Sequence, residues 1–177
     1  LRPDTLKVWD LETSFRRNRP DLVTLPQLFI AHGYTAVRVG KIFHNTHPDP
    51  RSWNMPSPEL PLKHLYLDVE TPKRLRDRAA AARRLGKDQS WVDALLRGPA
   101  TECIDARDNQ YRDGAATDVA IARLKELKNK SPFFLAIGYI KPHLPHTAPK
   151  KYWDLYDRDR LPMAENDFLP QDAPLWA

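Results

Sequence analysis

The chain has 177 residues, of which 41% are hydrophobic and 29% are charged, a composition typical of one globular domain with a hydrophobic core. Its 28 Lys and Arg residues against 23 Asp and Glu residues give a formal charge of +5, which favours anionic ligands. No apolar run approaches the about 20 residues that a membrane-spanning helix needs, so no membrane partner is expected. The single cysteine, Cys103, excludes an internal disulfide framework and a cysteine-based zinc site.

The first predicted unit, residues 1–44, contains a short helix followed by a strand. Thr24 and Gln27 have the spacing of a capping box, and Gly33 is suited to end the helix. The helix carries an apolar stripe at Leu25, Leu28 and Phe29. Residues 34–39 have the β-branched character of a strand.

Residues 45–112 are predicted to be an irregular insertion, because many of the 17 prolines fall between residues 45 and 72. The exception is a basic helix over 73–87, opened by Thr71-Pro72. A solvated face is one interpretation of this helix. The other is a wall of a substrate cleft that binds the acidic groups of a polyanionic sugar. Nucleic acid is not an expected partner, because no aromatic residues alternate with these charges.

The second unit, residues 113–146, repeats the order helix then strand. Asp113 is predicted to cap a helix. Its apolar stripe consists of Ala116, Val119, Ala120, Leu124 and Leu127. Residues 133–140 form an almost unbroken apolar run, which indicates a strand buried on both faces. The two units together predict an α/β fold with parallel strands, followed by a loop-rich tail over 147–177.

Each predicted strand is followed by a lysine and a histidine. Lys41 and His44 follow the first strand, and Lys141 and His143 follow the second. In an open parallel sheet, ligands bind beyond the carboxyl ends of the strands. Two such pairs at one edge would favour a multiply charged oxyanion and place a proton donor beside a leaving group. Spacing alone leaves open whether these residues form an anion site or are ordinary loop residues.

Several multi-residue motifs, in order, resemble the sulfatase family, in particular its iduronate-2-sulfatase-like members. The resemblance covers residues 1–44 and about 111–157 well, and the segment between them loosely. Its motifs are Arg2-Pro3-Asp4-Thr5, Trp9-Asp10, Phe15-Arg16, Thr24-Leu25-Pro26-Gln27, Gly33-Tyr34, Val39-Gly40-Lys41-Ile42-Phe43-His44, Ser131-Pro132-Phe133-Phe134-Leu135-Ala136-Ile137-Gly138-Tyr139, Lys141-Pro142-His143 and Pro149-Lys150-Lys151-Tyr152.

The resemblance implies an alkaline-phosphatase-like fold and a role for each of four residues. Lys41 would contact the sulfate group and the nucleophile, and His44 would assist the regeneration of that nucleophile. His143 would protonate the leaving oxygen of the sulfate ester, and Lys141 would bind substrate beside it. The implied substrate is a sulfated small molecule or glycan.

The chain also departs from the family pattern. The Cys/Ser-x-Pro-Ser-Arg motif that becomes formylglycine is expected upstream of Leu1, and Cys103 lacks its proline and serine. Calcium is expected in the complete enzyme but not in this chain alone, which lacks the family's ligand motifs. Asp154, Asp157 and Asp159 are interpreted as a solvated loop because no calcium-loop glycine follows them.

These departures predict a fragment of a sulfuric ester hydrolase that is inactive as this chain alone and that completes its site with the remaining part of the enzyme. The complete enzyme would be periplasmic, extracellular or lysosomal, with an export signal upstream of residues 1–5, while the compartment of this chain is not determined. Two alternatives are a phosphatase or phosphodiesterase of the same superfamily and a non-catalytic anion- or glycan-binding module.

Overall fold

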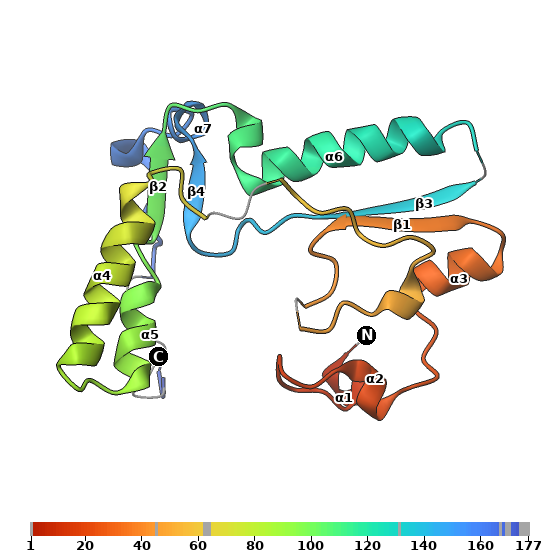
Figure 1. Cartoon of the computed structure of the whole chain (residues 1–177), viewed down its shortest axis with the longest axis horizontal. Helices are drawn as coiled ribbons and strands as arrows, with labels where there is room; N and C mark the ends of the chain where they lie inside the picture. Colours follow the sequence, from red (N-terminus) through yellow and green to blue (C-terminus); the bar gives the residue numbers. More distant parts are fainter. Residues whose placement is uncertain are drawn as a thin grey trace.

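The computed structural model describes residues 2–44, 46–61, 65–130, 132–166, 168 and 171–173. Two bodies lie side by side and are joined at one end (Figure 1). The first holds helices α1 (Pro3–Leu6), α2 (Phe15–Asn18), α3 (Leu25–Ala31) and α6 (Arg112–Leu127) with strands β1 (Thr35–Gly40) and β3 (Phe133–Gly138). The second holds helices α4 (Glu70–Arg84), α5 (Gln89–Leu96) and α7 (Lys150–Trp153) with strands β2 (Thr101–Ile104) and β4 (His146–Pro149). Single 3₁₀ turns lie at Pro50–Ser52, Asp108–Gln110 and Arg158–Arg160.

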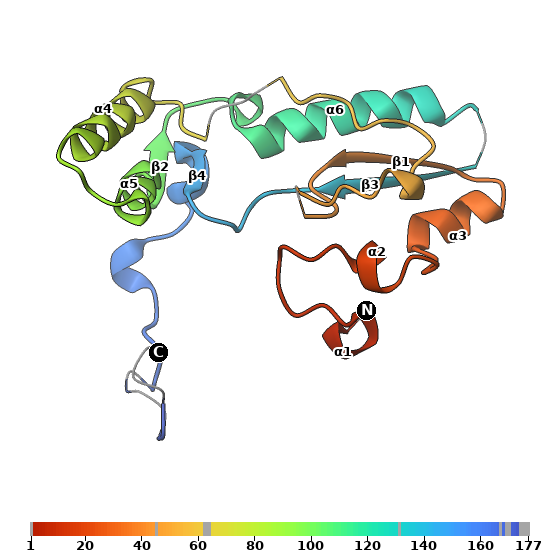
Figure 2. The ribbon, with the colours of Figure 1, turned by 60° about the horizontal axis from the view of Figure 1, so that its bottom comes forward.

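The first body is built on a parallel pair of strands. β1 pairs with β3 in a register that runs from Thr35 opposite Phe133 to Gly40 opposite Gly138. Helix α6 covers one face of this pair, and α3 lies on the other side (Figure 2). The core under α6 consists of buried Val39, Ala116 and Ala120 with partly buried Leu60, Val119 and Leu135. The expected α/β class with parallel strands is therefore confirmed at the level of short strand pairs.

Helix α3 begins as the sequence predicts, but of its apolar stripe only Phe29 is packed, against Phe134 and Tyr34. The side chain of Thr24 accepts a hydrogen bond from the backbone N–H of Gln27, whose own side chain returns to the backbone of Thr24. The chain leaves the helix through Gly33, which has a φ of +81° that glycine adopts without strain. Leu25 and Leu28 nevertheless remain 58% and 49% exposed. Their stripe faces an open apolar groove.

Two expectations for the second unit are wrong. Within β3 no residue is fully buried, and Ile137 is 43% exposed, because among the described residues β3 is paired with another strand along one edge only. Asp113 does not cap α6, since the helix begins at Arg112 with Tyr111 as the capping residue. The carboxylate of Asp113 is instead bonded to backbone groups beyond β3.

The second body shows that residues 45–112 are more regular than predicted. The expected basic helix is present as α4 and packs on α5 around Ala79, Ala82 and Val92. Strand β2, which carries the exposed thiol of Cys103, pairs in parallel with β4. The sequence analysis missed α5, β2 and β4. Among the described residues, no helix has the length and hydropathy required to cross a membrane.

A buried ion pair ties the N-terminal segment to the loop after β1. Nε and Nη2 of Arg16 donate to the two carboxylate oxygens of Asp49 at 2.9 and 2.8 Å, and Nη2 also donates to Gln27 at 2.8 Å. Ser52 donates to Asp49 and shares a 2.6 Å hydrogen bond with Thr24. Asp49 is only 7% exposed, so its charge depends on these partners. The network joins α2, the start of α3 and the turn at Pro50–Ser52.

Asp49→Ala should therefore destabilise the chain strongly. Removing one member of a buried charge pair leaves the other uncompensated, which typically costs about 3–5 kcal/mol. Urea unfolding of the variant should show this loss. The matched control is Asp154→Ala, which removes a solvent-exposed ion pair with Lys150 and should leave the unfolding midpoint unchanged. Equal midpoints for the two variants would contradict a structural role for the Arg16–Asp49 pair.

The contribution of Asp49 should also depend on pH. Burial alone would raise the pKa of Asp49, but hydrogen bonds from Arg16 and Ser52 and the charges of Arg16 and Arg51 outweigh it, so the pKa lies below 3.8. A carboxylate with a lowered folded-state pKa stabilises the fold above its ordinary pKa, and this stability is lost as pH falls through the folded-state value. The stability difference between wild type and Asp49→Asn should therefore be constant near pH 7 and shrink below pH 3.8. A difference independent of pH would contradict this assignment.

Candidate functional site

The carboxyl ends of β1 and β3 meet at one edge of the first body. The backbone N–H of Lys41 donates to the carbonyl oxygen of Gly138 at 2.8 Å, directly beyond the last paired residues. Both positions require glycine. A Cβ atom on Gly40, whose φ is +76°, would lie 2.2 Å from the oxygen of Gly138, and one on Gly138 would lie 1.8 Å from the oxygen of Lys41. The two loops that carry the predicted site residues therefore leave the sheet in contact.

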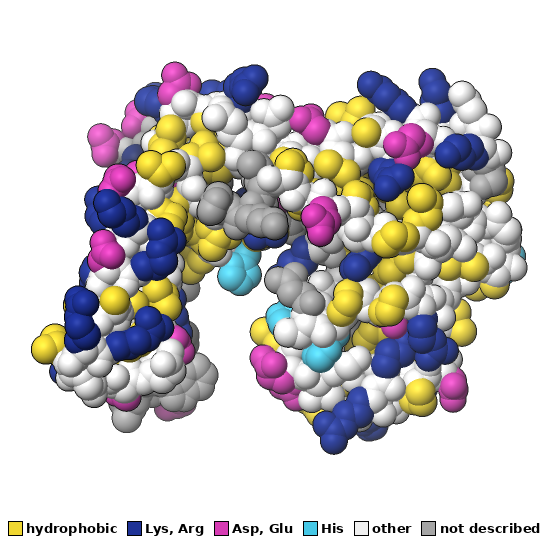
Figure 3. Space-filling model, in the orientation of Figure 1, with side chains coloured by type: hydrophobic (Ala, Val, Ile, Leu, Met, Phe, Trp, Pro, Cys, Tyr) yellow, Lys and Arg dark blue, Asp and Glu magenta, His cyan; other side chains and the backbone are white. Residues whose placement is uncertain are grey.

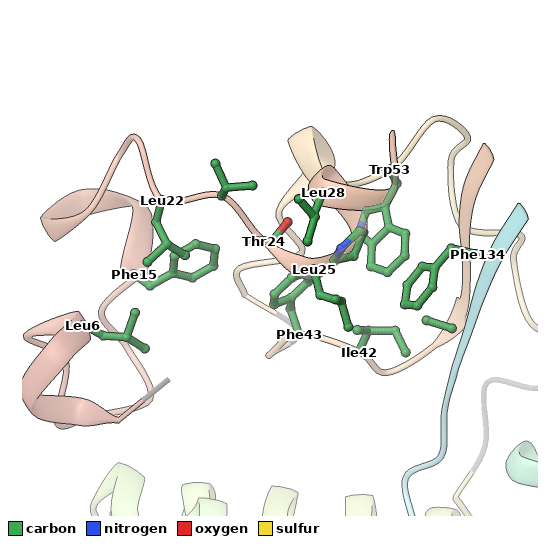
Figure 4. Close-up of a pocket in the computed structure, with 13 residues that line it drawn as sticks. Leu6, Phe15, Leu22, Thr24, Leu25, Leu28, Ile42, Phe43, Trp53 and Phe134 are labelled. Atoms are coloured by element: carbon green, nitrogen blue, oxygen red, sulfur yellow. The ribbon is translucent and has the colours of Figure 1, made fainter. Parts of the chain in front are cut away.

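The loop from Lys41 to His44 is anchored by the two apolar residues between them. Ile42 and Phe43 line an apolar groove of about 730 Å³ together with Phe15, Trp53 and Phe134 (Figure 4). The ring of Phe43 stacks on Phe15 at 5.9 Å and meets Trp53 edge-on at 6.2 Å. Burial of the middle of the loop places Lys41 at one end and His44 at the other, each half-buried.

His44 has a second histidine beside it that the sequence analysis missed. Nδ1 of His44 lies 2.8 Å from the hydroxyl of Thr46, and its ring centroid is 6.3 Å from that of His47. Nε2 of His47 lies 2.7 Å from the carbonyl oxygen of Glu12, which fixes that ring against the N-terminal segment. A histidine three residues after His44 gave no signal of its own, because its contact lies 35 residues away in the sequence.

The loop from Lys141 to His143 is held by backbone contacts. The N–H groups of Ile140 and Lys141 donate to the two carboxylate oxygens of Asp113, each at 2.9 Å. Nζ of Lys141 donates to the carbonyl oxygens of His143 and Pro145 at 3.0 and 2.5 Å. Burial lowers the pKa of Lys141, an effect that Asp113 opposes and Arg112 reinforces. The half-buried ammonium group of Lys141 thus stabilises its own loop by bonding to two backbone carbonyl oxygens.

His143 is the most accessible of the four predicted residues. Its ring is exposed, and Nδ1 lies 2.6 Å from the carbonyl oxygen of Leu144. If Nδ1 carries the proton of that hydrogen bond, Nε2 is the nitrogen that faces outward. That nitrogen makes no hydrogen bond within the described part of the chain.

The structure brings the two Lys/His pairs to one edge without joining them. Across the described ranges, no hydrogen bond or ion pair links Lys41 or His44 to Lys141 or His143. The space-filling view shows a recess between the two bodies, with histidine side chains on both of its sides (Figure 3). The arrangement offers separate cations and imidazoles around a space in which an anion could be bound.

The remaining candidates have different roles. The apolar groove has no titratable side chain in its lining and so cannot supply acid or base. Among the residues that the structure describes, no three His, Cys, Asp or Glu side chains are grouped as a metal site. The basic residues of α4 are exposed, and two of them are paired with acids, Lys73 with Glu70 and Arg74 with Asp68.

The sequence is similar to known sulfatases over almost its whole length. It is 33% identical over 180 residues to iduronate 2-sulfatase of Mus musculus and 32% identical over 180 residues to that of Homo sapiens, with 98% of this chain covered in both cases. It is 28% identical over 191 residues to a sulfatase of Formosa agariphila, with 99% of this chain covered. The chain spans only 30%, 30% and 34% of the length of these three proteins. No family model matches the chain.

The glycine contact at the strand ends can be tested with a matched pair. Gly40 and Gly86 both have positive φ, but only Gly40 has an atom within reach of a new Cβ. Gly86→Ala should cost about 1–2 kcal/mol of backbone strain. Gly40→Ala should cost about 1–3 kcal/mol more, because the methyl group overpacks the end of β3. Equal losses in denaturant unfolding would show that β1 and β3 do not touch at this point.

Proposed function

Because this chain is a sulfatase-family sequence, we propose that it forms the part of a sulfatase site that holds the sulfate group and the leaving oxygen of a sulfate ester. The observation that carries the proposal is the shared edge of β1 and β3, where the loops of both Lys/His pairs leave the sheet side by side. The strand pairing is consistent with an alkaline-phosphatase-like fold, in which a site lies beyond the carboxyl ends of parallel strands.

In this proposal Lys41 stabilises charge on the sulfate group. Its ammonium group makes no hydrogen bond or ion pair within the described residues, so it is available to an anion. A fixed cation next to the transferring group lowers the barrier most where negative charge develops. His44, three residues further along the same anchored loop, assists the regeneration of the nucleophile. The apolar anchor at Ile42 and Phe43 supports both roles, since it holds the two polar ends in place.

His143 protonates the oxygen of the departing alcohol or sugar as the sulfur–oxygen bond breaks. A protonated imidazole can give up its proton to the leaving oxygen at that step. Exposure of the ring and the orientation of Nδ1 toward Leu144 support Nε2 as the donating atom. Lys141 contributes positive charge beside the substrate, while its ammonium group holds the loop of His143 through two backbone carbonyls.

The nucleophile, the calcium ion and the rest of the substrate pocket would come from outside residues 1–177, so this chain alone is proposed to be inactive. No grouped metal ligands exist among the described residues, and no step is assigned to calcium here. The relatives are more than twice as long, and the groove beside α3 leaves Leu25 and Leu28 exposed where further parts of a sulfatase domain would pack. This exposed face argues against a self-contained binding module.

The substrate is proposed to be a sulfated small molecule or glycan. The names of two relatives refer to a sulfated sugar acid, and the positive charge of this chain is compatible with an acidic sugar. Such an enzyme would act in a periplasmic, extracellular or lysosomal compartment.

Variants of the complete enzyme that carries this segment test the proposal. His143→Ala should lower kcat at least about 100-fold with little change in KM, since general acid catalysis typically contributes about 10²–10⁴-fold. Lys41→Ala should lower kcat and raise KM, because the cation contacts the sulfate group in both the ground state and the transition state. Turnover of an aryl sulfate at neutral pH is the measurement.

His32→Ala is the matched control, because His32 is exposed at the end of α3 and bonds only to the carbonyl of Leu28. Its kinetic constants should equal those of the wild type. Near-wild-type turnover by His143→Ala or Lys41→Ala would overturn the roles given to them. Faster turnover of the matching aryl phosphate than of the aryl sulfate would favour a phosphatase or phosphodiesterase instead.

A further inference from the structure

Asp113 lies at the one point where a helix meets the loop of Lys141 and His143. It sits in the first turn of α6, which packs against both β1 and β3. Its two carboxylate oxygens accept hydrogen bonds from consecutive N–H groups, those of Ile140 and Lys141, directly after β3. A bidentate, charge-assisted contact of this kind fixes both position and direction of the backbone.

Two neighbouring contacts make the helix a rigid support for this carboxylate. The hydroxyl of Thr117, one turn after Asp113, lies 3.0 Å from the hydroxyl of Tyr139. A Cβ atom on Gly114 would lie 2.0 Å from the carbonyl oxygen of Asp108, so the start of α6 is pressed against the preceding turn. The chain just after β3 is therefore hydrogen-bonded to α6 at two successive turns of the helix, through Asp113 and through Thr117.

The same carboxylate sets the charge around Lys141. Asp113 raises the pKa of Lys141 against the opposing effects of burial and of Arg112. The groove of about 480 Å³ that Lys141 and Asp113 line is also lined by Asp108, Asp118, Tyr111, Tyr139 and Tyr152. Arg112 lines a neighbouring pocket together with Lys141. Tyr111 donates to Glu102, and the pKa of Tyr111 is raised by burial and by that carboxylate. Of the three carboxylates that line this groove, Asp113 accepts a hydrogen bond from Lys141, whereas Asp108 accepts one from Lys151 and Asp118 one from Asn109.

We propose that Asp113 is a positioning residue for sulfate ester cleavage: through the N–H groups of Ile140 and Lys141 it fixes the loop that presents His143 to the leaving oxygen. It touches neither substrate nor reacting atoms. This inference rests on the role proposed above for His143. It adds a residue of α6 to a site whose other members lie in the loops after β1 and β3.

Asp113→Asn in the complete enzyme is the primary test. An amide keeps one acceptor for the two N–H groups and removes the charge, so the loop loses one hydrogen bond and its direction. We expect kcat to fall roughly 10- to 100-fold, the range produced by small misplacements of a catalytic group, with KM changed less than about threefold. The basic limb of the pH–rate profile should move to lower pH, because the loop that carries the proton donor loses a nearby negative charge, and such a charge favours protonated groups.

The control is Asp118→Asn, which changes the same residue type on the same helix. Asp118 accepts a hydrogen bond from Asn109 and has no contact with the loop after β3. Its kcat and pH profile should match the wild type. Amide hydrogen exchange in the 177-residue chain gives a second readout that needs no turnover: Ile140 and Lys141 should exchange faster in Asp113→Ala than in Asp118→Ala.

The outcomes separate the two proposals. If His143→Ala abolishes turnover while Asp113→Asn keeps wild-type kcat and pH profile, the role of Asp113 is overturned and that of His143 stands. If His143→Ala keeps wild-type turnover, both are overturned. If Asp113→Asn loses activity only in proportion to its lost folded fraction, and its pH profile does not move, Asp113 is structural only and the inference fails.

Discussion

The parallel pairing of β1 with β3 is the constraint on which the first body depends. The two strands are separated by more than ninety residues, yet they end in register at Gly40 and Gly138. Parallel strands need a long crossover, and here the crossover includes α4, α5 and β2 of the second body as well as α6. A Cβ atom on Gly40 or on Gly138 would collide with the backbone of the neighbouring strand end, so the close approach of the strands requires glycine at both positions. Everything proposed for the site follows from the loops that leave the sheet at this contact.

The two loops are fixed by different physical means. The loop from Lys41 to His44 is held by apolar contacts of Ile42 and Phe43 with aromatic rings along the groove, and such contacts have no preferred direction. The loop from Lys141 to His143 is held by two directed hydrogen bonds to Asp113. The first leaves its lysine without a bonded partner among described residues, whereas the second leaves its histidine exposed. The division suits a site in which one loop binds charge and the other delivers a proton.

The chain combines small hydrophobic core clusters with polar contacts between its segments. The two core clusters are small, with Val39 and two alanines buried under α6 and Val92 and two alanines buried between α4 and α5. Polar networks carry much of the connection between segments, as Arg16 and Asp49 do for the N-terminal segment. Large apolar side chains such as Leu25 and Leu28 remain exposed. A surface of this kind is expected where a sulfatase of greater length continues the same sheet and core.

Local pattern in the sequence was sufficient for the cap of α3, a strand over 34–39 and the basic helix, because each depends on neighbours a few residues apart. It also placed Lys41, His44, Lys141 and His143 after strands. The family was also evident there, from ordered motifs. The tertiary structure alone decided that Asp113 bonds to the end of β3 instead of capping α6, that His47 lies beside His44, and that β3 is paired along one edge only among the described residues. It also decided that a short strand at Cys103 pairs with one at Ala148. These features depend on contacts between residues far apart in the chain, and neither periodicity nor spacing records which distant partner a carboxylate, a ring or a strand edge will meet.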